Sequence, residues 1–390
     1  MKESIIIRNV GPLKEVYIED VKPMTVLIGE SASGKSTLMK VIILMRYIYK
    51  MLNIRCYLKN AGVSKSPFRL KIDNLLSDDL VVYIKDNPDA FINYTATIHG
   101  HQYEIEVSKG KLITKSAANI PNEDLYFLKE SWISESRSVI PMWASKAAAN
   151  KKAELGFYFH ETLADFDKAT EAVRNLRLGF VGMDLQVVGQ NGKRKYFVVP
   201  EDNSYDRIEL KYASSGIQTS TPLATLVHYF AHEFSFKDAG RRSILDYLYE
   251  QDRLSSYRPE MEIMDLKKVV HIHVEEPELS LFPDAQCKLV DEMALEAFQQ
   301  KEVDRSLGLM LATHSPYIIN YLNVMLHQNK ANRAKITGEQ LGVFRIFDGR
   351  LQNLMVQNQM GKWLVNTKDL TEQMKSILVE YQSLSKQPRE

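Results

Sequence analysis

Residues 29–36 read GESASGKS and match the pattern GxxxxGK[S/T]. They lie between an apolar run at 24–28, typical of a buried strand, and a helical run at 37–51. Glycine at both ends lets the backbone turn so that consecutive N–H groups face an anion, and the helix adds the positive end of its dipole. This strand–loop–helix unit predicts an α/β fold with a nucleoside triphosphate site.

Within the predicted loop, Lys35 is expected to reach the β- and γ-phosphates and the Ser36 hydroxyl to take one position on Mg²⁺. The predicted phosphate-binding residues are Gly29, Glu30, Ser31, Ala32, Ser33, Gly34, Lys35, Ser36 and Thr37. Kinases, GTPases, helicases and ABC-type ATPases share such a loop. The rest of the chain must therefore distinguish among these classes.

Strand and helix patterns alternate in the second half of the chain, which predicts a mainly parallel sheet covered by helices. The expected elements are helix 219–234, strand 269–274, helix 285–298, strand 308–313, helix 316–326 and strands 342–347 and 351–356. Strands are also expected at 4–9 and 15–18, and an antiparallel meander at 80–115, beginning with VVYIKD. Residues 142–178 show helical spacing, and short strands are expected at 185–188, 196–199 and 207–210.

Composition places the chain among ordinary globular proteins. Its 50 basic and 49 acidic residues nearly cancel, so no overall basic charge indicates nucleic acid. Cys56 and Cys287 lie far apart in apolar contexts, which favours buried thiols in a reducing compartment, and we expect a cytoplasmic protein. Lys40 and Arg46 interrupt the most apolar stretch, which predicts a buried helix and no membrane span.

Consecutive carboxylates follow the expected strand at 269–274. Nucleotide hydrolysis needs one acid beside the Mg²⁺ and a second that orients and deprotonates the attacking water. Glu275 fits the first role and Glu276 the second. Taken alone, the segment also fits an acidic surface loop after a core strand, but its position relative to the phosphate-binding loop favours the catalytic interpretation.

Two more segments carry polar groups to predicted helix starts. His314 follows the strand 308–313 and precedes Ser315, a natural helix cap, so it is expected at the carboxyl edge of the sheet, where it can contact a γ-phosphate or attacking water. Ser214, Ser215 and Gly216 open another helix and form a second anion-binding end, with Gln218 beside them. Each segment alone is also explained as a capped helix.

In this order, GESASGKST, ASSGIQ, HIHVEEPELSLFPDAQ and LATHSP resemble the Walker A, signature, Walker B and switch-histidine motifs of SMC/RecF-like ABC ATPases. EEPE followed by LFP and a Gln, together with THSP, is most similar to bacterial OLD-like ATPases. That group includes ATPase subunits of the anti-phage systems Septu, PARIS and Gabija and of retron-associated modules. The resemblance implies an ATPase that uses ATP and Mg²⁺. A P-loop kinase or GTPase is a further interpretation, but it gives no reason for the ASSGIQ and THSP segments.

Residue by residue, the resemblance makes Glu276 and His314 catalytic, assigns metal binding to Ser36 and Glu275, and assigns to Ser214, Ser215 and Gly216 the nucleotide of a second subunit. The chain departs from the pattern at Glu275, where Asp is more usual, and at Phe282, where many relatives carry His. No clear Q-loop glutamine is found. Glu135 and Arg137 match a mid-chain segment of the family and are further site candidates, although a surface ion pair explains them equally well.

The implied architecture is a single ATPase head over 1–390. Its parts are expected at 1–135 for the phosphate-binding loop and antiparallel sheet, 136–262 for a helical lobe with the signature, and 263–390 for Walker B, the switch histidine and closing strands. Residues 315–390 contain no DxD pattern of a fused nuclease, so an effector nuclease or toxin is expected on a separate chain.

The implied partner is a second copy of the chain, in a dimer or higher oligomer that ATP assembles. The implied biology is a sensor or switch in anti-phage defence. The alternative is a DNA-repair or chromosome-maintenance ATPase that itself binds DNA, and it leaves nucleic-acid binding open. Basic residues suited to that role are Lys146, Lys151, Lys152, Arg241 and Arg242.

Overall fold

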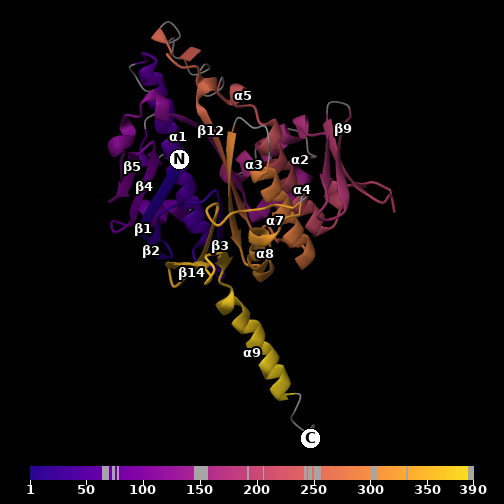
Figure 1. Ribbon diagram of the computed structural model, residues 1–390. Helices are drawn as coiled ribbons and strands as arrows, with labels where there is room; N and C mark the ends of the chain where they lie inside the picture. The colour runs from indigo at the N-terminus through magenta and orange to yellow at the C-terminus, as the bar shows by residue number, and fades with distance from the viewer. Residues whose placement is uncertain are drawn as a thin grey trace.

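The computed structural model (Figure 1) describes most of the chain. The described residues are 1–63, 70–72, 75–76, 79–144, 157–190, 193–204, 206–240, 244, 248–249, 256–299, 305–330 and 333–384. The expected helical run at 145–156 lies outside them, as do the basic residues named above, Lys146, Lys151, Lys152, Arg241 and Arg242.

In the described part of the chain, eleven strands form one mixed sheet in the order β6-β5-β4-β1-β2-β15-β14-β3-β13-β12-β7. The strands of its parallel part are β14 (Leu341–Phe347), β3 (Met24–Ile28), β13 (Arg305–Thr313), β12 (Lys267–Glu275) and β7 (Tyr126–Ile133). Its antiparallel part consists of β1 (Lys2–Val10), β2 (Leu13–Ile18), β4 (Phe91–Ile98), β5 (His101–Ser108) and β6 (Lys111–Ile113). β15 (Arg350–Asn353) joins the two parts because it pairs antiparallel with β14 and parallel with β2. The predicted α/β fold class is confirmed.

The register of the parallel part places three strand ends together. Thr313 at the end of β13 is opposite Ile28 of β3, and Glu275 at the end of β12 is opposite Ala312 of β13. The phosphate-binding loop, the acidic pair and His314 all follow these ends directly. In parallel sheets such a carboxyl edge is where ligands bind.

The antiparallel meander continues the main sheet and does not form a sheet of its own, because β4 pairs with both β1 and β5. The expectation of a strand at VVYIKD was wrong. Residues Val81–Lys85 form a π-helical turn in which only Ile84 is buried. Both edges of β4 are already paired, so this short alternating segment packs beside β1 instead, and its Tyr83 lines the same cavity as the phosphate-binding loop.

The expected helical lobe contains both helices and a separate antiparallel sheet. Its helices are α2 (Ile140–Ala144), α3 (Phe157–Ala172), α4 (Ser215–His228) and α5 (Phe236–Gly240). Its four described strands are β8 (Asn175–Leu178), β9 (Met183–Gln190), β10 (Lys193–Pro200) and β11 (Ile208–Glu209). The short strands expected at 185–188, 196–199 and 207–210 are therefore confirmed, whereas the helical expectation was wrong at 175–178, which pair with β9 as β8.

The remaining described elements close the fold and extend from it. They are α7 (Pro283–Phe298), α8 (Pro316–His327), the hairpin of β16 (Met355–Gln357) and β17 (Trp363–Val365), and α9 (Lys368–Leu384). Figure 1 shows α9 projecting away from the body of the molecule.

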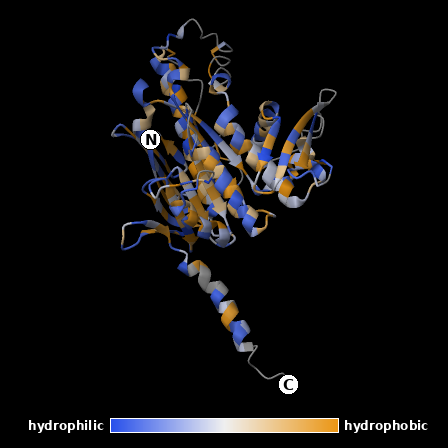
Figure 2. Cartoon of the chain, turned by 45° about the vertical axis from the view of Figure 1, so that its right-hand side comes forward, coloured by the Kyte–Doolittle hydropathy of each residue, from blue (hydrophilic) through white to orange (hydrophobic). Residues whose placement is uncertain are grey.

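Helix α1 (Lys35–Asn60) is the centre of the hydrophobic core and is buried on most sides. Figure 2 shows apolar residues concentrated in the central strands and helices. A helix that is apolar around most of its circumference must be covered on all sides by the protein. None of the helices in the described ranges has the length and apolar character needed to cross a membrane.

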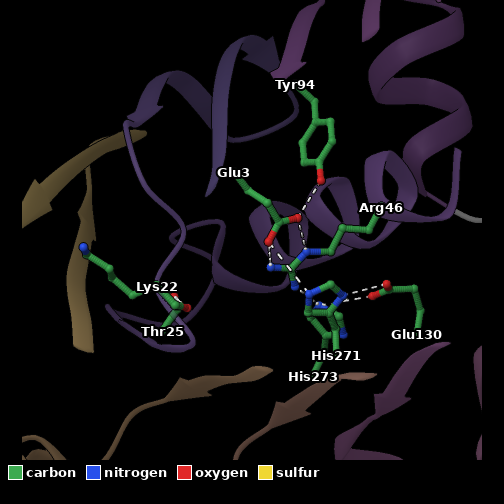
Figure 3. Close-up of polar contacts among 8 residues, drawn as sticks. All are labelled: Glu3, Lys22, Thr25, Arg46, Tyr94, Glu130, His271 and His273. Carbon is green, nitrogen blue, oxygen red and sulfur yellow. Dashed lines mark hydrogen bonds and ion pairs between the residues drawn. The ribbon is translucent and has the colours of Figure 1, made fainter. Parts of the chain in front are cut away.

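Arg46 of α1 is buried and is held by an ionic network between α1 and the strands β1 and β12 (Figure 3). Its guanidinium donates to both carboxylate oxygens of Glu3 at 2.9 and 2.6 Å and lies 3.0 Å from Nε2 of His273. Burial alone would raise the pKa of Glu3, but the charge of Arg46 lowers it to about 2. The network therefore fixes α1, and with it the phosphate-binding loop at its start, against β1 and β12.

Candidate nucleotide site

The phosphate-binding loop has the backbone shape that its sequence predicts. Gly34 has φ 104°, in the region that favours glycine, and a Cβ there would lie 2.7 Å from Cδ2 of Leu13. A Cβ on Gly29 would lie 2.6 Å from Oγ of Ser33. That Oγ is buried and is without a hydrogen-bond partner among the described residues. The cradle therefore requires glycine at these two positions, and it contains a buried hydroxyl that a phosphate oxygen would satisfy.

Lys35 begins α1 and points back into this loop. Its side chain is buried, and Nζ donates to the carbonyl oxygens of Gly29 and Glu30, both at 2.9 Å. Burial lowers the pKa of Lys35, while the acidic residues at 275, 276 and 278 act in the opposite direction. The ammonium is thus held beside the loop in a partly desolvated position, which strengthens its attraction to an anion.

Glu275 ends β12 and shares its environment with a second carboxyl group, that of Glu135. The side chains of Glu135 and Ser36 both interact with that of Glu275. Burial, followed by the interaction with Glu135, raises the pKa of Glu275 to about 8, and the same interaction lowers the pKa of Glu135. The oxygen atoms of Ser36, Glu275 and Glu135 are hard ligands of the kind that Mg²⁺ prefers.

Glu276 follows at a sharp change in backbone direction. Its φ of 44° is unusual for a residue with a side chain, and its N–H donates to the Ala312 carbonyl at 2.8 Å. The turn carries the side chain out of the strand, where 38% of it is exposed. Strain of this kind persists where the surroundings enforce it, and here it directs a carboxylate toward the cavity.

His314 lies opposite Glu276. Its Nε2 is 3.8 Å from Oε1 of Glu276, and 35% of the side chain is exposed, so water reaches both groups. The position of His314 is set by Glu278, which accepts from the backbone N–H of His314 at 2.6 Å and from the Thr313 hydroxyl at 2.8 Å. Ser315 caps α8 as expected, because its Oγ accepts from the N–H of Ile318 at 3.3 Å.

Arg137 connects the acidic strand end to the start of α4. It is 1% exposed and donates to four backbone carbonyls. These belong to Glu275 at 2.6 Å, Ser134 at 2.9 Å, Thr219 at 3.1 Å and Glu276. Burial lowers the pKa of Arg137 to about 10 although the surrounding acids oppose the shift. The sequence left this residue open between a site role and a surface ion pair, and its burial excludes the surface interpretation.

A cavity of about 730 Å³ brings most of the predicted residues together. The predicted residues that line it are Ser31, Ala32, Ser33, Gly34, Lys35, Ser36, Thr37, Glu275, Glu276, His314 and Glu135. Gly29 and Glu30 begin the loop without lining the cavity, and they contribute the carbonyl oxygens that accept from Lys35. Segments more than 200 residues apart in the chain therefore form one concave site.

The segment 214–218 lies outside the lining of this cavity. Ser214 and Ser215 are exposed at the N-terminus of α4, whereas Gly216 is buried against Ser280, whose carbonyl would lie 2.6 Å from an added Cβ. Gln218 donates through Nε2 to the carbonyls of Lys211 and Ala213 at 2.9 and 2.8 Å. The helix start is thus open to a ligand presented from outside the chain.

Sequence reasoning missed several residues of the site. Glu278 positions His314, Gln286 accepts from the Ser315 hydroxyl at 2.6 Å, and Tyr83 and Lys40 line the cavity. The sequence did indicate Glu278, because it is the third acid of EEPE. The polar residues that follow β13 also require a hydrogen-bond partner, and Glu278 is that partner. Tyr83 could not have been found, since it depends on the π-helical turn that was expected to be a strand.

Fold and site together define an α/β protein with a phosphate-binding loop and an acidic strand end at one sheet edge. No protein-family model matches the chain, and no curated protein matches it. Among solved structures it is similar to the SMC head domain from Thermotoga maritima, with 11% identity over 92% of this chain and 100% of that one and a TM-score of 0.38. It is also similar to the recombination mediator protein RecF-ATPrS of the RecFOR pathway, with 12% identity over 90% of this chain and 98% of that one and a TM-score of 0.37. Function is therefore inferred from the residues of this chain.

Proposed function

We propose that the chain is an ABC-type ATPase that binds ATP with Mg²⁺ and hydrolyses it. The observation that carries the proposal is the convergence of the phosphate-binding loop, the Glu275–Glu276 pair and His314 on one cavity of about 730 Å³. A surface loop with acidic residues gives no reason for this convergence. The buried lysine and the unsatisfied Ser33 hydroxyl in the same loop further support an anionic ligand.

Each group of residues at the cavity has a separate role in binding or hydrolysis. Backbone N–H groups of the loop and Lys35 would hold the phosphates, and Ser36 and Glu275 would hold the Mg²⁺. The metal, when bound, supplies positive charge that stabilises the charge developing on the phosphate oxygens. Glu276 accepts the proton of the attacking water, and His314 donates a hydrogen bond to the reacting groups.

The exposed N-terminus of α4 supports a second part of the proposal, which is that two copies of the chain associate. Ser214, Ser215 and Gly216 lie outside the cavity of their own chain, and the resemblance to ABC-type ATPases implies that they contact the nucleotide of a second copy. Two chains would then enclose two nucleotides, with each site incomplete in the monomer. Gln218 is placed to support the loop before α4 through its bonds to Lys211 and Ala213.

Lys35→Ala is expected to weaken ATP binding by about 10- to 100-fold, because a charge-assisted hydrogen bond to a phosphate contributes roughly 1.5–3 kcal/mol. Isothermal titration with ATP and Mg²⁺ measures the change. Lys59→Ala is the matched control, since Lys59 lies at the other end of the same helix and contacts Asn119. If Lys35→Ala and the unmodified protein bind ATP with equal affinity, the loop does not bind the phosphates.

Ser215→Arg is expected to abolish ATP-dependent dimerisation while leaving the ATP affinity of the monomer within about twofold. The new side chain would extend from an exposed helix start that the partner must approach closely. Light scattering with a non-hydrolysable ATP analogue reports the oligomer. Ser204→Arg places the same side chain in another exposed loop and is expected to dimerise normally; loss of dimer in both variants would show that Ser215 is not specific.

The biological role that we propose is a sensor or switch that controls a separate nuclease or toxin in anti-phage defence. It is supported by the OLD-like sequence resemblance and predicts a gene for such an effector beside the gene for this chain. The alternative, a DNA-repair or chromosome-maintenance ATPase, predicts turnover that DNA stimulates and that salt suppresses. Measuring ATP turnover with and without duplex DNA over a range of salt concentrations separates the two.

A further inference from the structure

Two histidines and a glutamate meet on the side of the molecule formed by α4 and α7. His228 is the last residue of α4, and His232 lies in the π-helical turn Tyr229–Glu233 that continues it. Glu296 faces them from α7, which packs against α4. None of these residues takes part in the nucleotide cavity.

The three side chains converge closely. His228 and His232 have ring centroids 4.5 Å apart, because residues four apart lie on one face of a helix. Nδ1 of His228 lies 3.4 Å from Oε1 of Glu296, and Nε2 of His232 makes a short hydrogen bond to Oε2. One potential ligand atom from each residue lies within 4.8 Å of those from the other two.

Ordinary ion pairing accounts for only part of this arrangement. Nδ1 of His228 is buried and, despite the nearby carboxylate, makes no hydrogen bond of acceptable geometry within the described residues. A carboxylate and two imidazoles presented together are a common ligand set for zinc.

Neighbouring cations pair with other acids. Arg177 pairs with Glu201 at 2.8 Å and Lys288 with Asp284 at 2.7 Å. Arg333 lies 3.6 Å from Asp291. These three cations line an adjoining cavity of about 410 Å³, to which His228 and Glu296 also contribute. A cation bound by the cluster would thus be reachable from solvent.

We propose that His228, His232 and Glu296 bind a divalent transition metal ion, with Zn²⁺ as the preferred ion. Tetrahedral Zn²⁺ with ligand distances of about 2.0–2.2 Å needs its ligand atoms about 3.4 Å apart, which small side-chain rotations achieve from the observed positions. Three protein ligands leave a fourth position for water on the side of the cavity. Nitrogen and carboxylate ligands without a cysteine suit Zn²⁺ better than Mg²⁺ or Ca²⁺.

Such an ion would tie two functional parts of the chain together. Helix α4 begins at Ser215, in the segment expected to contact a partner's nucleotide, and α7 begins shortly after the Glu275–Glu276 pair. Joining the far ends of both helices would hold the lobe in a fixed position on the main sheet. The metal site does not depend on the nucleotide assignment, because the two sites share no residue.

The test is a titration of untagged, chelator-treated full-length protein with Zn²⁺ alone, in the absence of nucleotide and Mg²⁺. The unmodified protein is expected to bind one equivalent that His232→Ala and Glu296→Gln both lose or bind at least about 100-fold more weakly. Zn²⁺ should raise the Tm of the unmodified protein and not that of either variant. Co²⁺ in place of Zn²⁺ should give the visible absorption of a tetrahedral site.

His101→Ala provides the matched control. His101 and His99 also face a carboxylate, but they bind separate oxygens of the buried Asp124, which Tyr103 contacts as well. This variant is expected to bind Zn²⁺ like the unmodified protein, and circular dichroism checks that all variants are folded. Absence of stoichiometric binding, or an equivalent retained in both His232→Ala and Glu296→Gln, would overturn the proposal and leave a cluster of ion pairs.

Discussion

Glu276→Gln is expected to lower ATP turnover by about 10²- to 10⁴-fold, the usual contribution of a general base, while ATP still binds. Glutamine keeps the size of the side chain and the unusual backbone at φ 44° but cannot accept the proton of the attacking water. The phosphate-binding loop and Lys35 are unchanged, so binding should remain within a fewfold of the original affinity. Because hydrolysis is what would separate the two copies, the ATP-bound dimer should accumulate.

Single-turnover release of phosphate and titration of ATP measure the two effects separately. Glu123→Gln changes an exposed glutamate in a turn remote from the cavity and is expected to behave like the unmodified protein. Undiminished turnover in Glu276→Gln would assign proton transfer to another group. Loss of ATP binding together with turnover would instead place Glu276 among the residues that hold the nucleotide or its metal.

The sequence was most informative where local patterns and tertiary structure agree. The apolar run before the glycine loop and the two runs before the acidic pair and His314 became β3, β12 and β13, neighbours in the sheet. Parallel strands carry their following loops to one edge, so the meeting of these motifs could be predicted before any coordinate was known. Local chemistry also predicted that Ser315 caps a helix and that the backbone turn at position 34 requires glycine.

The remaining features depend on contacts that no local pattern encodes. Val81–Lys85 alternates like a strand, yet the neighbouring strand edges were already occupied. The interaction between Glu135 and Glu275 joins chain segments 140 positions apart, and nothing in either segment predicts the other. The strands expected within 136–262 were located correctly, but their assembly into a separate sheet came only from their pairing.

Arg137→Met is expected to lower the free energy of unfolding by about 3–5 kcal/mol. Methionine fills much of the volume but donates no hydrogen bond, so the carbonyls of Ser134, Thr219, Glu275 and Glu276 lose a shared charged donor in the protein interior. Urea denaturation followed by circular dichroism measures the loss. Arg8→Met is the control, since Arg8 is 55% exposed in a loose pair with Glu15 and should change stability by less than about 0.5 kcal/mol.

Arg137→Lys separates positioning from folding. Lysine keeps the charge but lacks the planar fork that reaches both the acidic strand end and the Thr219 carbonyl in α4. We expect kcat to fall about tenfold with the affinity for ATP unchanged, because Arg137 holds the backbone of Glu275 and Glu276 and does not line the cavity. If kcat is unchanged in a folded Arg137→Lys variant, Arg137 only stabilises the fold. If kcat falls as expected, the bond to Thr219 gives a physical route by which a partner docked on the start of α4 would affect the position of the catalytic carboxylate.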